Sequence, residues 1–199
     1  MSESLLIFLA VVSAIANFVG LFPYIRDILA KKTKPERATW WIWLCLSFVA
    51  FSAQVAAGAI WSLAMTGAQG IGVFIIAILS VKYGYGTFRK KDYISLLIAG
   101  IGIALWAITD NPLTALLIVV FVDILAFYLT ISKTWNNPET ETLISWVLAT
   151  VSGLAGLLAV GAFDLTELVY PLYITLGNGF LSWVIFTRRK AIKKIALNV

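Results

Sequence analysis

The chain contains an internal repeat. The stretch that begins at Pro35 is echoed without a gap by the stretch that begins at Pro138, 103 residues later. The matched positions are Pro35 and Pro138, Glu36 and Glu139, Thr39 and Thr142, Trp43 and Trp146, and Gly58-Ala59 and Gly161-Ala162. A repeat constrains the fold strongly, because each copy forms the same structural unit. We therefore expect two copies of one unit, with each repeated proline opening a helix at its first turn.

Composition places these units in a membrane. Of the 199 residues, 61% are hydrophobic and 13% are charged, whereas soluble domains carry about 25% charged residues. The chain has no histidine, and its single cysteine, Cys45, lies in an apolar run. These counts exclude a disulfide framework, a histidine-based catalytic centre and the usual zinc sites. We expect an integral membrane protein without a cofactor and without enzymatic activity.

Apolar segments long enough to cross a bilayer, which takes about 20 helical residues, occur seven times. They run from Leu5 to Ala30, Thr39 to Ala59, Ser62 to Val81, Tyr93 to Ile108, Leu113 to Ile131, Thr142 to Gly161 and Leu165 to Thr187. None alternates polar and apolar residues as a transmembrane β-strand does. The sequence predicts an all-α membrane protein with seven transmembrane helices.

The 15 basic residues predict how these helices are oriented. They cluster around the first, third and fifth loops and in the tail, whereas the second, fourth and sixth loops carry only the acidic Asp110, Asp164 and Glu167. By the positive-inside rule, the N-terminus lies outside and the C-terminus in the cytoplasm. The basic clusters are thus explained by orientation in the lipid bilayer, which is the expected partner, and not by binding to nucleic acid. We expect the membrane to be a prokaryotic plasma membrane.

Repeat and orientation together predict the architecture. A triplet of helices has an odd number of crossings, so one linker helix must lie between two triplets that share an orientation. This predicts a 3+1+3 arrangement with a first repeat at 1–86, a linker helix at 87–111 and a second repeat with its basic tail at 112–199. Parallel repeats related by an axis along the membrane normal occur among transporters.

This arrangement resembles the PQ-loop superfamily, which includes the SWEET sugar transporters and the PnuC vitamin transporters. The resemblance rests on the helix triplets, the linker helix, the orientation, and a proline near the inner end of the first helix followed by a basic loop. These last residues are Phe22-Pro23-Tyr24-Ile25-Arg26 and Lys31-Lys32. The family's glutamine is Tyr24 here, and the second copy reads Ala126-Phe127 in place of Pro-Gln.

The resemblance also implies positions for a substrate pathway. The positions that line the central site in SWEET transporters hold Gln54 and Gln69 in the first triplet, and Leu157 and Tyr173 in the second. Asn178 lies one turn beyond Tyr173 on roughly the same helical face, and Asn17 is a further candidate. Hydrogen bonding between helices, worth about 0.6 kcal/mol per bond, is the alternative role for these side chains.

Asp123 is the one acidic residue well inside a predicted span. A carboxylate in mid-helix costs about 2.5 to 3.5 kcal/mol on insertion scales, so it faces the bundle interior. Its position in the repeat corresponds to Gly20. We assign Asp123 to the substrate pathway, as a coupling site or a substrate contact, with a structural carboxylate bonded across helices, for example to Asn17, as the alternative.

Gate and hinge residues are predicted where the repeat or a proline marks them. Trp43 and Trp146 are retained at the same repeat position while their neighbours change, which suggests a cytoplasmic gate or packing between triplets; anchoring at the membrane interface is the alternative. Pro23 removes a backbone hydrogen bond and is predicted to hinge the first helix.

These features favour a transporter of a small polar solute, such as a sugar, vitamin or metabolite, that works by alternating access between the triplets. An ion channel is the second class, although no ring of like charges or filter-like loop is evident. A non-transporting receptor or scaffold is the third, and a homo-oligomer is left open.

Overall fold

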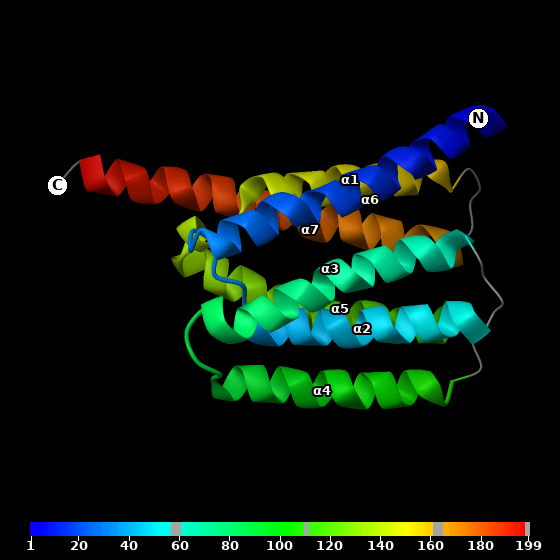
Figure 1. Cartoon of the computed structure of the whole chain (residues 1–199), viewed down its shortest axis with the longest axis horizontal. Helices are drawn as coiled ribbons and strands as arrows, with labels where there is room; N and C mark the ends of the chain where they lie inside the picture. The colour runs from blue at the N-terminus through cyan, green and yellow to red at the C-terminus, as the bar shows by residue number, and fades with distance from the viewer. Residues whose placement is uncertain (57–60, 110–111, 161–164, 198–199) are drawn as a thin grey trace. The chain divides into compact units, whose positions relative to one another are not determined.

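The computed structural model describes residues 1–56, 61–109, 112–160 and 165–197. In these ranges every element is an α-helix apart from one 3-10 turn, which confirms the all-α class. The elements, labelled in Figure 1 except for the turn, are α1 (Glu3–Leu29), α2 (Arg37–Ala56), α3 (Trp61–Tyr83), α4 (Lys90–Ala107), α5 (Pro112–Asn136), the 3-10 turn η1 (Pro138–Thr140), α6 (Leu143–Ala159) and α7 (Leu165–Leu197). Each predicted segment corresponds to one helix.

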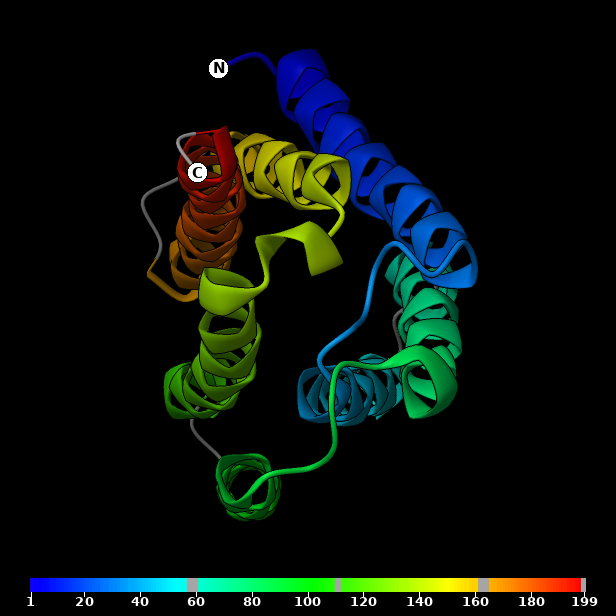
Figure 2. The same ribbon diagram turned by 90° about the vertical axis from the view of Figure 1, so that its left-hand side faces the viewer.

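The helix ends differ from the prediction in two ways. The repeated prolines do not open the long helices: α2 begins at Arg37, and Pro138 starts η1, which Figure 2 shows between α5 and α6. At the other end of the chain, α7 continues past Thr187 to Leu197. Apolar periodicity marks only the part of a helix that meets lipid, and lysine and arginine are good helix formers that are favourable near a helix C-terminus.

The helices expose apolar side chains in the manner of a membrane protein. Among the described residues, three segments are long and apolar enough to cross a membrane, namely Glu3–Leu29, Thr114–Asn136 and Leu168–Leu197; Gln69–Tyr83 and Leu143–Ala159 are apolar but shorter. Along α1 the exposed residues include Phe8, Val11, Ile15, Phe18 and Phe22. This spacing of three or four residues forms one continuous apolar stripe. A stripe of this size on a surface marks contact with lipid or protein.

The chain divides into two compact units. One contains Met1–Lys34 and Thr130–Val199, and the other contains Pro35–Leu129. Each unit therefore combines helices from both halves of the sequence, and α5 contributes to both. The predicted boundaries at 86 and 111 concern the sequence repeat and stay a prediction.

In the unit formed by Pro35–Leu129, α2 packs against α3 and α4. Its core contains Ala38 and Ile42 of α2, Ala99 of α4, and Val122, Ala126 and Leu129 of α5. Trp43 packs against this core from its partly buried position. The core thus fixes the face of α5 on which Asp123 lies, next to Val122.

In the other unit, α6 lies beside both α1 and α7 (Figure 1). Ser13 and Ser152 each donate a hydroxyl to the other's backbone carbonyl, at 2.8 Å in both directions. Gly153 lets α7 approach closely, because a Cβ there would lie 2.8 Å from the backbone nitrogen of Thr175. Small and hydroxyl side chains are the residues through which membrane helices pack.

Candidate functional site: two buried carboxylates held by tryptophans

Asp123 and Trp43 meet across the interface between α2 and α5. The indole Nε1–H of Trp43 donates a hydrogen bond to Oδ1 of Asp123. The aspartate is 3% exposed, so its carboxylate is shielded from solvent as well as placed in an apolar helix. Two residues that the sequence assigned separately, one to the substrate pathway and one to a gate, thus form a single site.

Aromatic rings surround the indole of this pair. Trp43 makes edge-to-face contacts with Trp40, at 5.0 Å between ring centroids, and with Phe127, at 5.3 Å. Beside them, the hydroxyl of Thr39 donates to the carbonyl of Ala126 at 2.8 Å. These contacts hold α2 against α5. The carboxylate therefore lies in a region that is filled by aromatic rings and hydrogen-bonded groups. The Ala126-Phe127 dipeptide, read as a lost Pro-Gln pair, has a packing role.

A second carboxylate is held by the other repeated tryptophan. Trp146 Nε1–H donates to Oε2 of Glu141 at 2.8 Å, and Lys133 Nζ donates to Oε1 of the same carboxylate. Neither the Lys133 nor the Glu141 side chain has exposed surface. Lys133 also donates to the carbonyl of Lys34 at 2.7 Å. The ammonium therefore joins the end of α5, the segment before α6 and the segment after α1.

The two tryptophans make equivalent ring contacts but use carboxylates from different positions. Trp146 packs edge-to-face on Tyr24 at 5.9 Å, as Trp43 packs on Phe127, and Tyr24 and Phe127 are also 103 residues apart. The position that matches Asp123 is Gly20, where a Cβ would already lie 3.4 Å from Leu148 Cβ. A Cβ there would be in van der Waals contact with α6, and Gly20 itself offers no carboxylate. The second copy therefore takes its carboxylate from Glu141, which corresponds to Ala38.

Hydroxyl groups reinforce the second junction. Thr33 and Thr142 lie 2.5 Å apart between hydroxyl oxygens, and the hydroxyl of Thr142 donates to Oδ2 of Asp27 at 3.0 Å. The backbone N–H of Lys34 donates to the carbonyl of Thr140 at 3.0 Å. Lys31, with φ of 60°, turns the chain after α1. The segment that follows α1 is thereby held against η1 and the start of α6.

Comparison with known families gives a match over the first part of the chain. Residues 1–97 match the family described as the cation efflux transmembrane domain. The match covers just under half of the 199 residues. No curated protein and no solved structure matches the chain.

This match overturns the resemblance to the PQ-loop superfamily, because the model that residues 1–97 match is that of a different family. The features that carried the resemblance, an odd number of helices, basic loops and a proline near a helix end, follow from membrane insertion and are shared by unrelated helical proteins. The expectation of a sugar or vitamin as substrate rested on this resemblance and is therefore also wrong. The chain is an integral membrane protein, and the match supports a membrane transporter in general.

The remaining pathway residues are divided between the two units, and their common role stays a prediction. Asn17, Tyr173 and Asn178 lie in the unit that contains α1, α6 and α7, whereas Gln69 and Asp123 lie in the other. Asn178 is buried and donates to the carbonyl of Ile174 on its own helix at 2.8 Å.

The other three are less enclosed: Tyr173 stacks at a tilt on Tyr170, Asn17 is half-buried, and Gln69 is exposed on α3. Gln54 belongs to α2, and its side chain lies outside the described part. Pro23 lies inside α1, which continues through it, so the hinge stays a prediction.

Sequence reasoning missed Lys133 and Glu141. Lys133 was counted only among the basic residues that orient the chain, and Glu141 was not considered. The available signal was their spacing of eight residues around Asn137-Pro138, which turns the chain back and lets the two side chains meet. A basic residue in the last turn of an apolar helix, followed by a turn and an acidic residue, predicts such a pair.

Proposed function

We propose that this chain is a membrane transporter that carries a cation, with Asp123 as the carboxylate on the cation's path. The match of residues 1–97 to a cation efflux transmembrane domain supports the charge of the substrate. Asp123 supports its location, because the carboxylate is buried within an apolar helix. An ionisable group inside a membrane segment marks an ion or proton pathway by default.

The geometry around Asp123 supports a change of charge at this point. An indole N–H stabilises an ionised carboxylate by hydrogen bonding, yet the indole is neutral and leaves the negative charge in place. A cation or a proton that arrives at Asp123 offsets that charge. The rings of Trp40, Trp43 and Phe127 favour a cation further, since aromatic faces attract positive charge. Asp123 and these rings together form a site of alternating occupancy.

The donor set favours a singly charged cation. Among the described residues, no three histidine, cysteine, aspartate or glutamate side chains gather as metal ligands. Divalent ions such as Ca²⁺ and Zn²⁺ take four to eight oxygen, nitrogen or sulfur ligands. One carboxylate beside aromatic rings suits a monovalent inorganic ion, a proton or an organic ammonium instead. We propose transport of this class rather than catalysis.

The proposed architecture is the 3+1+3 arrangement with the N-terminus outside. Its support is the pair of equivalent contacts, Trp43 with Phe127 and Trp146 with Tyr24, each between the second helix of one repeat and the first helix of the other. Exchange of first helices between repeats explains why each compact unit contains residues from both halves of the sequence. Rocking of one unit against the other is the movement that alternating access requires.

The decisive experiment is uptake into proteoliposomes that contain the full chain. The cation panel comprises Na⁺, K⁺, a pH gradient, choline, Mn²⁺ and Zn²⁺; glucose and nicotinamide riboside serve as neutral and vitamin-like controls. The informative variant is Asp123→Asn, which removes the charge and keeps the size. Its matched control is Glu139→Gln on the surface, where the glutamate side chain is 69% exposed.

We expect a singly charged cation of the panel to be transported by the wild type and by Glu139→Gln, and at least a ten-fold loss, about 1.4 kcal/mol, in Asp123→Asn. Elution of this variant as a single species in size-exclusion chromatography checks that it folds. Transport of Mn²⁺ or Zn²⁺ alone would contradict the proposed charge of the substrate. Transport of a neutral solute without any cation would refute the proposal. Equal cation transport by wild type and Asp123→Asn would remove Asp123 from the path.

A further inference from the structure

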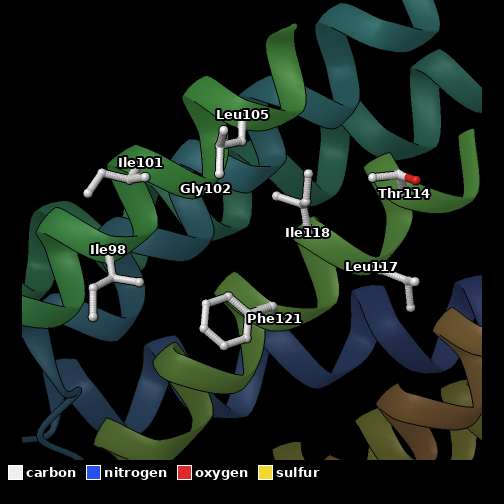
Figure 3. A pocket seen from close by; sticks show the side chains of 8 residues that line it. All are labelled: Ile98, Ile101, Gly102, Leu105, Thr114, Leu117, Ile118 and Phe121. Atoms are coloured by element: carbon white, nitrogen blue, oxygen red, sulfur yellow. The ribbon is translucent and has the colours of Figure 1, made fainter. Parts of the chain in front are cut away.

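An apolar groove runs between α4 and α5. It has a volume of about 280 Å³. On α4 its wall is formed by Ile98, Ile101, Gly102 and Leu105, and on α5 by Thr114, Leu117, Ile118 and Phe121 (Figure 3). Apart from the Thr114 hydroxyl, every side-chain atom in these walls is carbon, and four of the residues are about half exposed: Ile101, Leu105, Leu117 and Phe121. The groove is thus open along the exposed surface of α4 and α5.

Gly102 creates the shape of this groove. A Cβ at this position would lie 2.4 Å from Cγ2 of Val122, so the side chain of Val122 on α5 packs directly on the backbone of α4 at Gly102. Larger side chains line the groove before and after this contact, among them Ile98 and Leu105 on α4. The result is a narrow, open slot along the helices rather than an enclosed cavity. A slot of this kind matches an extended hydrocarbon chain better than a compact ligand.

The groove leads to positive charge at the N-terminal end of α4. Lys91 lies seven residues before Ile98 and fourteen before Leu105, so these residues share one helix face. Its Nζ lies 5.7 Å from the centroid of the Tyr128 ring, and Tyr128 in turn follows Phe121 by seven residues on α5. Lys91 and Tyr128 therefore continue the two walls of the groove. Lys90, beside Lys91, is exposed.

Neighbouring charges leave this end positive. Arg89 pairs with Glu36 at 3.4 Å and with Asp92 at 3.5 Å. The two carboxylates are thus engaged by the arginine, and the charges of Lys90 and Lys91 add to this group. Partial burial and the adjacent Arg89 lower the pKa of Lys91, which lies two residues before the predicted span. An anionic group close to Lys91 would relieve this unfavourable environment of the ammonium.

We infer that this groove binds one acyl chain of an anionic phospholipid whose headgroup lies against Lys90 and Lys91. The dimensions agree: from Lys91 to Leu105 an α-helix rises about 21 Å, and the hydrocarbon of one leaflet is about 15 Å thick. A chain that starts at the lysines therefore reaches well into the groove. Basic residues beside an apolar helix surface recognise anionic headgroups. This lipid site is independent of the proposed cation transport.

The test is photo-crosslinking of the full chain in phosphatidylcholine nanodiscs. Equal small fractions of phosphatidylglycerol or phosphatidylcholine with a diazirine on one acyl chain are added in parallel samples, and the labelled peptides are mapped by mass spectrometry. Lys91→Gln removes charge at the headgroup position, and Lys193→Gln removes an equal charge from the exposed end of α7 as the matched control. Leu117→Trp fills the groove from its exposed wall, and Ile101→Trp does so from the other.

We expect wild-type peptides from 98–105 and 114–121 to be labelled more strongly by phosphatidylglycerol than by phosphatidylcholine. Lys91→Gln should lower the phosphatidylglycerol labelling roughly five-fold, the factor expected for one basic residue near an anionic surface, and Lys193→Gln should leave it unchanged. Either tryptophan variant should reduce labelling by both lipids. Three results would overturn the inference. The two lipids could label the wild type equally, or the two lysine variants could lose labelling equally. The third is that two chains are crosslinked to each other at these peptides and no lipid adducts form.

Discussion

Lys133 and Glu141 form an ion pair in which neither side chain has exposed surface. The lysine lies in the last turn of α5, which the sequence marks as a membrane span, and the glutamate precedes α6 beyond the turn η1. Their contact is supported by Trp146, which donates to the second oxygen of the carboxylate. A buried pair of this kind is sensitive to the loss of one partner, because the other is left as an uncompensated charge.

Lys133→Met should therefore destabilise the protein by roughly 3 to 5 kcal/mol. The double variant Lys133→Met/Glu141→Gln should recover part of that loss, since no buried charge remains and the glutamine oxygen still accepts from Trp146. Denaturant unfolding in detergent, followed by circular dichroism, measures both. Arg26→Gln breaks a surface ion pair, in which the arginine is 73% exposed, and should cost no more than about 1 kcal/mol. A double variant no more stable than Lys133→Met would contradict this account of the pair.

Trp43→Phe should destabilise the protein by about 1 to 3 kcal/mol, because the buried carboxylate of Asp123 loses its indole donor while the ring contacts are retained. A double-mutant cycle with Asp123→Asn isolates the pair, and a coupling energy above about 0.5 kcal/mol is expected from unfolding midpoints. Trp183→Phe on the exposed face of α7, where the tryptophan is 54% exposed, is the matched control and should change stability little. Additive effects of Trp43→Phe and Asp123→Asn would show that the hydrogen bond contributes nothing.

Gly153→Ala should destabilise the contact between α6 and α7 by about 1 to 3 kcal/mol. The added methyl group would lie 2.7 Å from Oγ1 of Thr175 and 2.8 Å from its backbone nitrogen, and backbone atoms move only with their helix. At Gly100 nothing lies within 4 Å of the corresponding position. Gly100→Ala should therefore be neutral or stabilising by up to about 1 kcal/mol. Thermal unfolding of the two variants side by side makes the comparison, and similar midpoints would argue against close packing at Gly153.

The sequence was sufficient to predict the helices and to single out Asp123 and Trp43, because apolar runs, a lone intramembrane carboxylate and a repeated tryptophan are local signals. It was insufficient to predict their hydrogen bond. The two residues are 80 positions apart, and their meeting depends on which faces α2 and α5 present to each other. The repeat pointed to Trp43 and Trp146 together. The carboxylates that they use, Asp123 and Glu141, stand at different repeat positions, and which side chain reaches each indole is a property of packing.

Lys133 shows a second limit. The positive-inside rule already explained a basic residue at this position. No further role was therefore sought for Lys133, and its buried ion pair was missed. The family resemblance failed for a similar reason, since an arrangement of helices and basic loops describes how a chain inserts into a membrane and says little about ancestry or substrate. Residue-level contacts, rather than architecture, separate the candidates for function.

The last prediction concerns orientation in the membrane. It can be tested by cysteine labelling, because the chain has a single cysteine that can be replaced. In a Cys45→Ala background, Ser2→Cys, Lys32→Cys and Lys194→Cys place one thiol each before α1, after α1 and near the end of α7, and all three positions are exposed. A membrane-impermeant maleimide should label Ser2→Cys in intact cells. It should label Lys32→Cys and Lys194→Cys only after permeabilisation, because the positive-inside rule keeps the basic loops in the cytoplasm.

The three positions check one another. Ser2 and Lys32 flank α1, so they must differ if that helix crosses the bilayer, whatever its direction. Ser2 and Lys194 must also differ if the number of crossings is odd, as the seven predicted spans require. Labelling of Ser2→Cys and Lys194→Cys from the same side would exclude seven crossings and with them the 3+1+3 arrangement. A fully reversed pattern would preserve the arrangement and reject only the external N-terminus.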